Sequence, residues 1–482
     1  MKMGLKKNIN IPDKILSLNP DELDLDPKSK ILIHQLLGII ERMAQTIQEL
    51  QRENQKLKDE INRFKGEKGR PYFKPNVPKK ENDVCRGKDS KEWKKESKKS
   101  RVKIDRVEVL SVDPDILPTD VEYKGHRDVV VQNIRFETDN VEYRLERYYS
   151  PGEQKVYEAK LPNEVDGGFG AELKSFAVYL YFSCRVPEEK IRRMLTEAGI
   201  VISEGEISNI LTKTCHEKFT QEKEDIFEAG MKSADYFHID DTGARHKGVN
   251  HHVQVICNLL FSAFFITRKK DRDTILGVLG LNEGGKIGKI MISDDAKQFM
   301  FIAAYHALCW LHEIRHYRKL NPVLEYHRAQ LHTFLTEIWE FYELLKEYKK
   351  QPSKQQKIVL EQIFDKLFST ETGYQELDER IQLTKKKKKK LLLVLTYPQI
   401  PLHNNPAEIA LRELVIKKRI SYGTRSENGK TAWENMMTIM DTCRKQDVNF
   451  RDYLEDIFSR RYAMPRLSTL ISGKAMVNPT SY

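Results

Sequence analysis

The sequence predicts a mixed α/β core that is interrupted by a helical insertion and preceded by an N-terminal coiled coil, a small β-rich module and a helix-turn-helix. Three observations predict this architecture. Strand-like apolar segments follow one another between residues 233 and 310, helical periodicity occupies 311–398, and a heptad pattern fills the later part of residues 1–65. A chain of 482 residues that mixes strands and helices in this way is expected to form several folded units.

The composition indicates a globular protein with an excess of positive charge. The chain has 82 Lys and Arg residues against 71 Asp and Glu residues, a formal net charge of +11, which suits nucleic acid or another anionic surface as a partner. No apolar run reaches the roughly 18 residues that a membrane span needs, and the first residues lack the apolar core of a secretory signal. The six cysteines are scattered without a CxxC pair, which argues against a disulfide framework or a zinc ribbon. We therefore expect a cytoplasmic protein that contacts no membrane.

A heptad pattern runs from Ile33 to Phe64, where apolar residues recur at alternating steps of three and four. Asn54 falls on a core position of the a type, and a single buried Asn at such a position fixes register and favours a two-stranded assembly. We therefore predict a homodimeric coiled coil within residues 1–65; the alternative is an amphipathic helix that packs on its own domain. The core positions of the d type are Leu36, Met43, Leu50 and Leu57.

Two segments of different character follow the heptads. Residues 66–103 are rich in Lys and Arg, contain prolines and have almost no aliphatic residues, so they are expected to form a flexible basic linker that lies along phosphates or is simply solvated. Residues 104–165 contain short alternating segments, VEVLSV, RDVVVQNIRFET and EYRLERYYS. This alternation predicts a small β-rich module.

Residues 166–232 are predicted to be helical and to contain a helix-turn-helix around Gly199. Ser203, with Glu206 three residues later, has the pattern of a capping box that begins the second helix. In a basic protein this arrangement favours a DNA-reading unit, although many helical pairs are purely structural. The predicted DNA-binding residues are Ser203, Ser208 and Asn209, together with Lys385 and Lys388 of a six-lysine run that is alternatively a solvated face.

Acidic residues follow two of the predicted strands and begin a later helix. Asp240 and Asp241 come at the end of one apolar segment, Asp294 comes at the end of another, and Glu408 lies near the start of a helix. Two carboxylates about 4 Å apart repel by roughly 4 kcal/mol at an effective dielectric of 20, and a shared divalent cation removes this cost. Because the ligands are all oxygens, such a cation is expected to be Mg²⁺ or Mn²⁺.

Each of these acids also has a purely structural explanation. The aspartates of the first pair can cap a turn, and those of the second pair, 294–295, can cap a helix over 297–304. Glu408 can close a capping box with Asn405, or it can pair with Arg412 one turn later. Spacing alone does not choose between these structural roles and a metal site.

Several motifs together resemble the transposases of the IS66 insertion-sequence family over residues 166–455. The two most specific are Cys309-Trp310-Leu311-His312 and Asn404-Asn405-Pro406-Ala407-Glu408-Ile409-Ala410-Leu411-Arg412. They occur in the family's order with Asp240-Asp241-Thr242, Ser293-Asp294 and Tyr422-Gly423-Thr424-Arg425. The N-terminal coiled coil also matches the architecture of that family.

The resemblance implies a DDE transposase with an RNase H-like catalytic core in two parts, 233–310 and 399–482, separated by the helical insertion at 311–398. It further implies a protein that works in the cytoplasm near the nucleoid, with the terminal inverted repeats and target DNA as partners and accessory proteins of the same element as candidate partners. By position, Asp240, Asp294 and Glu408 are the catalytic residues and the ligands of two Mg²⁺ or Mn²⁺ ions, with no zinc expected. The supporting residues implied by position are Asp241, Asn404, Asn405, Arg412, Trp310 and His312.

The chain departs from the family pattern at two places. Asp241 stands where the family usually has Glu, which leaves a choice between Asp240 and Asp241 as the first acid. The family commonly has a cysteine-rich zinc segment where this chain has no cysteine between residues 146 and 160. Two other functions therefore compete with an active transposase: a catalytically inactive DNA-binding relative, and a coiled-coil scaffold that contacts acidic proteins.

Overall fold

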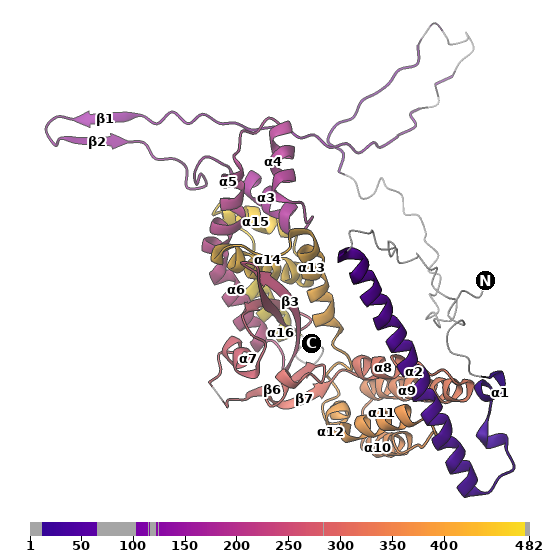
Figure 1. Cartoon of the computed structure of the whole chain (residues 1–482). Coiled ribbons are helices and arrows are strands. Elements are labelled where there is room, and N and C mark those ends of the chain that lie inside the picture. The colour runs from indigo at the N-terminus through magenta and orange to yellow at the C-terminus, as the bar shows by residue number, and fades with distance from the viewer. Residues whose placement is uncertain are drawn as a thin grey trace. The chain divides into compact units, whose positions relative to one another are not determined.

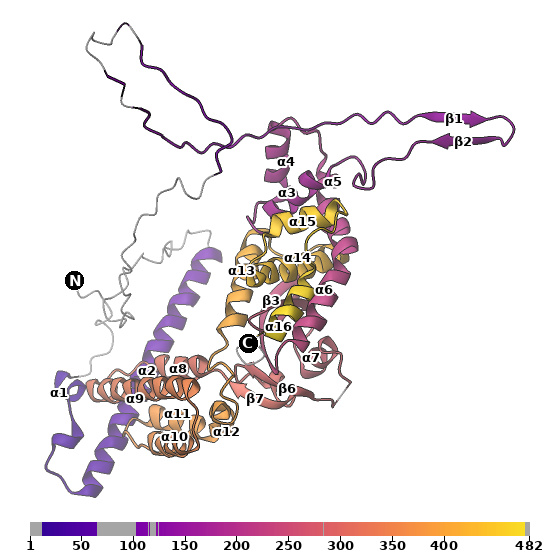
Figure 2. The ribbon, with the colours of Figure 1, turned by 180° about the vertical axis from the view of Figure 1, so that it is seen from behind.

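The computed structural model describes residues 12–64, 103–113, 115, 122–123, 125–282 and 284–477. The chain divides into two compact units, one of residues 55–139 and the other of the residues before and after that segment. Figures 1 and 2 show the helices and strands from opposite sides. The predicted basic linker lies outside the described residues, apart from residue 103. In the described part of the chain, no helix combines the length and the apolar character needed to cross a bilayer.

A five-stranded sheet forms the centre of the larger unit, with the order β5-β4-β3-β6-β7. The central strand, β3, pairs antiparallel with β4 and parallel with β6; β5 extends the antiparallel side and β7 the parallel side. In the parallel ladder, His238 of β3 lies opposite Ile292 of β6. The strands are β3 (Tyr236–His246), β4 (Val249–Cys257), β5 (Ser262–Thr267), β6 (Ile287–Ser293) and β7 (Ala303–Leu308).

The segment after Asp294 differs from the helix considered over residues 297–304. A single turn of 3-10 helix, η5 (Lys297–Phe299), leads directly into β7, so the helical interpretation of this segment is wrong. The parallel ladder with β6 satisfies the backbone of β7, and Phe299 is buried in the core beside it. Tertiary pairing therefore decides the structure of a segment whose local pattern is ambiguous.

Helices pack on both faces of the sheet. Consecutive side chains of β6 point to opposite faces, and over residues 290–293 both sets are buried. Met291 belongs to one buried cluster, whereas its neighbours Ile290 and Ile292 belong to the other. The first cluster joins the sheet to helices from before and after it. These are α3 (Ala171–Phe182), α4 (Glu188–Glu197), α5 (Glu204–Asn209), α6 (Cys215–Lys232), α7 (Arg272–Val278), α13 (Asn405–Ser421), α14 (Glu427–Gln446), α15 (Phe450–Phe458) and α16 (Leu467–Val477).

The second cluster joins the other face of the sheet to the predicted helical insertion, in which helices are present as expected. The break expected near Pro352 is present, because one helix ends at Lys350 and the Ser353 hydroxyl accepts a hydrogen bond from the backbone N–H of Gln356 to begin the next. The insertion contains α8 (Trp310–Arg318), α9 (Glu325–Lys350), α10 (Lys354–Leu367), α11 (Gln375–Lys386), α12 (Lys388–Leu391) and the 3-10 turn η6 (Leu393–Leu395).

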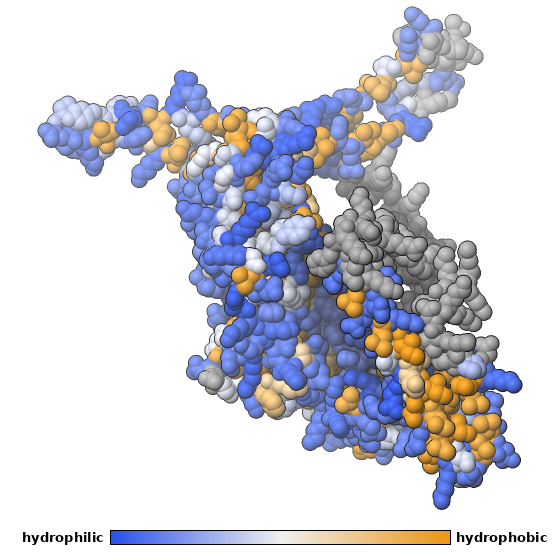
Figure 3. Space-filling view, in the orientation of Figure 1, coloured by the Kyte–Doolittle hydropathy of each residue, from blue (hydrophilic) through white to orange (hydrophobic). Residues whose placement is uncertain are grey.

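The predicted N-terminal helix is present as α2 (Pro27–Phe64), after the short α1 (Asp13–Leu16) and η1 (Pro20–Glu22). One face of α2 packs on the insertion: Leu37 and Glu41 are buried, and the Glu41 carboxylate contacts the ring of His327 at 3.2 Å. For that face of α2, the alternative prediction of an amphipathic helix that packs on its own domain is therefore correct. The d positions 36, 43, 50 and 57 form a different, exposed face, and Figure 3 shows hydrophobic residues gathered along the lower part of α2.

Residues 104–165 contain less regular secondary structure than the sequence predicts. The β-rich module expected at 104–165 contains one hairpin, β1 (Arg147–Ser150) with β2 (Lys155–Glu158). The strands expected over 107–112 and 127–138 are absent from the described residues, because their apolar side chains find no second layer: Leu110 is 88 % exposed and Val131 is 82 % exposed.

Two helices, α4 and α5, lie on either side of Gly199, at the position of the predicted helix-turn-helix. Gly199 has a φ of +90°, a conformation that glycine adopts without steric cost, and the Ser203 hydroxyl accepts from the backbone N–H of Glu206 at 3.1 Å. The second helix then continues through a π-helical turn, η4 (Ile210–Thr214), into α6. The function of this helix pair in reading DNA stays a prediction.

Candidate active site

The fold directs the three predicted acids toward one edge of the sheet. Asp240 lies in β3 and Asp294 follows β6, each two residues beyond the paired positions His238 and Ile292. Because β3 and β6 are parallel, both aspartates lie at the same end of adjacent strands. Glu408 lies in the first turn of α13, a helix that packs directly against β3.

The charges of the neighbouring acids act on Asp240. Burial, together with the negative charges of Asp294, Asp241 and Glu408, raises the pKa of Asp240 to about 7. The hydrogen bond that Asp240 accepts from the backbone N–H of Asp241, at 2.8 Å, opposes this shift without cancelling it. This half-buried carboxylate is repelled by the negative charges of its neighbours. A cation that binds there relieves this repulsion, so its binding is especially favourable.

The neighbouring Asp241 has a different environment. Its carboxylate accepts a hydrogen bond from the Gln298 side chain at 2.8 Å and lies 3.5 Å from the Lys270 ammonium. Consecutive side chains of a strand point to opposite faces, which separates the two aspartates. The charge of Asp241 is therefore already paired, whereas that of Asp240 is opposed by other acids.

Asp294 lies beside a cavity of about 570 Å³ with a strongly charged lining. Its carboxylate accepts from the backbone N–H of Ala296 at 3.1 Å, so it holds a turn and does not cap a helix. The cavity has room for a polar ligand and gives solvent access to this edge of the sheet. Its charged and polar lining residues are Asp294, Asp295, Cys309, His312, Glu313, Arg315, His316, Lys319, Arg380 and Lys387.

Glu408 reaches across to the insertion. Its carboxylate accepts two hydrogen bonds from the Arg315 guanidinium, at 2.8 and 3.0 Å, and lies 3.6 Å from the His312 ring. Both structural alternatives for this residue are wrong: the pairing is with Arg315 and not with Arg412, and α13 is preceded by Asn404 as cap residue without a side-chain capping bond. Glu408 thus connects α13 to α8.

Asn404 has a clear positioning role that sequence reasoning could not assign. Fully buried, it donates from its side chain to the carbonyl oxygen of Ile239 at 3.0 Å and contacts the His238 ring nitrogen Nδ1 at 3.0 Å. Its backbone N–H donates to the Cys309 sulfur at 3.2 Å. These bonds join the start of α13 to the strand residues just before Asp240 and to the start of α8.

His238 is a buried residue of this region that sequence reasoning missed. Burial lowers its pKa to about 3, so the ring is neutral and one nitrogen donates while the other can only accept. The signal in the sequence was a lone polar ring inside an apolar strand, two residues before the acid. Such a residue needs a buried partner, which only the folded chain identifies as Asn404.

The other predicted supporting residues separate into packing and surface positions. Trp310 is fully buried in the insertion, where its indole N–H donates to the Leu391 carbonyl at 3.0 Å and its ring packs on Phe341, so its role is packing. Asn405 is the first residue of α13. Arg412 is exposed on that helix.

The predicted DNA-binding residues lie on α5 and on the α11–α12 segment, and contacts within the protein engage several of them. Ser203 caps α5, the Ser208 carbonyl accepts from Thr212, and Asn209 ends α5. Lys385 donates to the Ser369 hydroxyl at 2.8 Å, and Lys388 lies 2.7 Å from the Asp365 carboxylate. It is Lys387, between these lysines, that contacts the cavity, 2.7 Å from the Asp295 carboxylate.

Comparison with known proteins gives two findings. A family described as "Transposase IS66 family" matches residues 166–432, a range that includes the sheet, the insertion and all three acids. The chain is also 29 % identical, over 323 residues, to an uncharacterized protein, y4jO, of Sinorhizobium fredii. That similarity covers 52 % of this chain and all of the other protein.

Proposed function

The chain belongs to the IS66 transposase family, and on that premise we propose that it is a DDE transposase whose catalytic residues are Asp240, Asp294 and Glu408. The proposed reaction is cleavage at the ends of an insertion sequence, followed by attack of the freed 3′ hydroxyl on target DNA. The observation that carries the proposal is that Asp240 and Asp294 lie at the same end of two adjacent parallel strands and that Glu408 lies in the first turn of the helix that packs on β3. In the chain, Asp294 and Glu408 are 54 and 168 residues away from Asp240.

The topology of the sheet supports an RNase H-like core. Three antiparallel strands in sequence, β3 to β5, are joined through α7 to two strands parallel to β3. In this order the first acid lies on the central strand and the second follows its parallel neighbour. The insertion then separates β7 from the helix that holds the third acid, as expected for a core built from two stretches of the chain.

The residues present fit divalent cations of the Mg²⁺ class. The donors of the proposed triad are carboxylate oxygens only, and their mutual repulsion is relieved by positive charge. Asp240, Asp294 and Glu408 would hold two such ions, which supply Lewis-acid activation of the attacking oxygen and stabilisation of the leaving oxygen. The paired charge of Asp241 favours Asp240 as the first ligand.

Other residues of the chain prepare this site. Asn404 and His238 hold β3 against the start of α13, which fixes the distance between Asp240 and Glu408. Arg315 supplies a counter-charge to Glu408 and, with a side chain 45 % exposed, is free to turn toward a DNA phosphate. Lys387 and the other basic residues of the cavity give the incoming DNA backbone a positive surface beside Asp294.

The experiment is cleavage of a labelled DNA end by the purified full-length chain in Mg²⁺. Asp294→Asn should reduce cleavage and strand transfer by at least about 10³-fold, because a metal ligand contributes several kcal/mol to transition-state stabilisation. Asp273→Asn, an exposed acid of α7, is the matched control and should cleave normally. Undiminished cleavage by Asp294→Asn would reject the triad. Salt-dependent DNA binding without any cleavage by the wild type would instead favour the inactive DNA-binding relative.

The exposed face of α2 supports a homodimer as the active form. Its d positions are 49–60 % exposed: Leu36, Met43, Leu50 and Leu57. Apolar residues at this spacing are stabilised by a second helix with the same seam, and Asn54 then faces its own copy. In analytical ultracentrifugation, Leu50→Glu should convert a dimer to a monomer. Arg52→Glu, a charge change outside the heptad core, should leave the dimer intact.

A further inference from the structure

A second group of metal-binding side chains lies beside the proposed triad and differs from it in chemistry. Cys309, His312 and Glu408 each offer one ligand atom, and these atoms lie within 4.8 Å of one another. Cys309 directly precedes α8 and His312 lies in its first turn, whereas Glu408 comes from α13, almost a hundred residues later. The group lies beside the cavity described above, whose lining includes Cys309 and His312.

The donor set selects a different class of cation from that of the triad. A thiolate and an imidazole are preferred by Zn²⁺ and similar ions, whereas Mg²⁺ binds oxygen ligands. In a tetrahedral zinc site with metal-ligand bonds of about 2.0–2.3 Å, neighbouring ligand atoms are about 3.5 Å apart. Side-chain rotations therefore suffice to close the present group around an ion, with solvent in the cavity as the fourth ligand.

Two details of the surroundings favour a binding site over a chance cluster. The His312 nitrogen Nε2 faces the Glu408 carboxylate at 3.6 Å, and the other ring nitrogen, Nδ1, is buried and has no hydrogen-bond partner among the described residues. The Cys309 sulfur, 1 % exposed, is held in place by the hydrogen bond from the Asn404 backbone. The ligands are thus positioned by the same contacts that position the triad.

A cation already interacts with this group. The Arg315 guanidinium binds the Glu408 carboxylate and also lies 3.1 Å from His312 Nε2. Since the Arg315 side chain is 45 % exposed, it can leave for solvent when a divalent ion takes its place. The group therefore favours positive charge at this position.

We propose that Cys309, His312 and Glu408 form an inhibitory site for a cation of the Zn²⁺ class. Binding breaks the Cys309 S–H bond, releases its proton to solvent and forms a sulfur-metal bond, with no change of oxidation state. Because Glu408 belongs to both groups, a cation held here withdraws that carboxylate from Asp240 and Asp294. The inhibition, though not the binding itself, rests on the proposed function.

Binding is tested by titrating the full-length chain with Co²⁺ in the absence of DNA. The wild type should develop a near-ultraviolet thiolate-to-cobalt band at one equivalent, and Zn²⁺ should remove it by displacement. Cys309→Ser should lack the band, and His312→Asn, which keeps the thiol, should bind Co²⁺ at least 10-fold more weakly. Cys184→Ser removes an exposed cysteine of another region and should behave like the wild type. A band that persists in Cys309→Ser, unchanged affinity in His312→Asn or no band in the wild type would each overturn the proposal.

Inhibition is tested separately, by adding Zn²⁺ to the Mg²⁺-dependent cleavage reaction. The Zn²⁺ concentration for half-inhibition should rise at least 10-fold in Cys309→Ser, with each variant compared with its own zinc-free rate. Equal sensitivity of the two proteins would reject the inhibitory role. If the cobalt band is present and no variant cleaves DNA, the proposed function fails and the metal site stands. If cleavage occurs and the cobalt band is absent, the proposed function stands and the metal site is rejected.

Discussion

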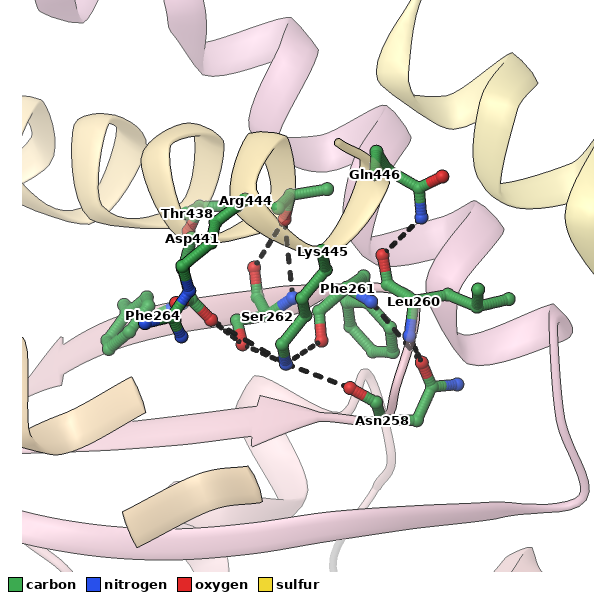
Figure 4. A network of polar contacts seen from close by, with 11 residues as sticks. Asn258, Leu260, Phe261, Ser262, Phe264, Thr438, Asp441, Arg444, Lys445 and Gln446 are labelled. Atoms are coloured by element: carbon green, nitrogen blue, oxygen red, sulfur yellow. Dashed lines mark hydrogen bonds and ion pairs between the residues drawn. The ribbon is translucent and has the colours of Figure 1, made fainter. Parts of the chain in front are cut away.

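Asp441, a buried residue of α14, and Asp240, a half-buried residue of β3, have opposite surroundings. Asp441 of α14 is 4 % exposed and accepts a hydrogen bond from the Ser262 hydroxyl at 2.6 Å, while Arg444 and Lys445 of the same helix supply positive charge (Figure 4). Lys445 in turn donates to the backbone carbonyls of Asn258 and Phe261, in the turn between β4 and β5. Asp240, on the central strand, has the acids Asp294, Asp241 and Glu408 as charged neighbours instead.

The difference separates a carboxylate that stabilises the fold from one that lowers its stability. A buried acid with cations and hydrogen-bond donors around it costs little and is destabilising to remove. A buried acid among other acids is destabilising as it stands, and it is retained where a ligand brings the missing charge. Glu313 of α8, which contacts Arg380, Thr384 and Lys387, belongs with Asp441 in the first group.

We expect the largest effect from Asp240→Asn, which changes the acid whose charged neighbours are other acids. Cleavage of a DNA end in Mg²⁺ should fall by at least about 10³-fold because a metal ligand is lost. The same change removes a repelled buried charge, so the melting temperature of the metal-free protein should rise or stay equal. A lower melting temperature, or a cleavage rate like that of the wild type, would contradict the contrast with Asp441.

Asp441→Asn makes the corresponding change at the acid that is surrounded by cations and hydrogen-bond donors. It leaves Lys445 without its carboxylate and should cost about 3 kcal/mol of local stability. The measurement is hydrogen exchange of the β5 amides, which should become faster, while cleavage per folded molecule is retained. Unchanged exchange in β5 would show that this network contributes little to the fold.

Glu41→Gln tests a third buried carboxylate, the one that attaches α2 to the insertion. Burial raises the pKa of Glu41, but hydrogen bonds from His327 and from the backbone N–H groups of Leu324 and Val323 outweigh it and hold this pKa below its usual value. Loss of the charge should cost about 2 kcal/mol and speed exchange of these two amides. Glu49→Gln, an exposed change on the same helix, should have no effect on them.

Lys417 has the opposite environment to Asp240, because it is a buried cation that forms no ion pair with a carboxylate within the described part of the chain. Burial lowers its pKa to about 7; the negative charge of Glu188 partly opposes this shift, and the positive charge of Arg185 adds to it. The Lys417 ammonium donates to the Tyr181 carbonyl at 2.8 Å. Between pH 7 and 10.5 the unfolded chain binds one proton more than the folded chain, so stability should increase as pH rises.

The expected gain is about 1 kcal/mol between pH 7.5 and 8.5, measured by urea unfolding. Lys417→Met should remove this increase because neither state then titrates at this position. Lys366→Met, an exposed lysine of α10, should keep the slope of the wild type. A wild-type stability that is flat over this interval would mean that Lys417 stays charged.

Local patterns were sufficient to predict the elements that hold the acids. Apolar strands that end in aspartate, helical periodicity with a break at Pro352 and a heptad before Phe64 are properties of neighbouring residues, and the structure contains each corresponding element. The strand β7 was missed because its conformation depends on pairing with β6 rather than on its own sequence. The same dependence explains the strands that were expected before residue 140 and are absent from the described residues.

The partners within the site could not be predicted, because they come from distant parts of the chain. Arg315 and Glu408 are separated by 93 residues, and His238 and Asn404 by 166. The expectation of no zinc rested on the oxygen-only ligands of the predicted triad and on the absence of CxxC pairs. Neither observation bears on a cysteine, a histidine and a glutamate that come together from the starts of α8 and α13. Cys309 and His312 are only three residues apart, but the glutamate that joins them comes from α13, almost a hundred residues later.

The most direct test of the central claim is calorimetric titration of the metal-free protein with Mn²⁺. Proteins with Asp294→Asn and with Asp273→Asn are compared with the wild type. If the three carboxylates share divalent ions, the wild type and Asp273→Asn should bind two Mn²⁺ equally well, whereas Asp294→Asn should lose one ion or bind at least 10-fold more weakly. Identical titrations of all three proteins would contradict the account.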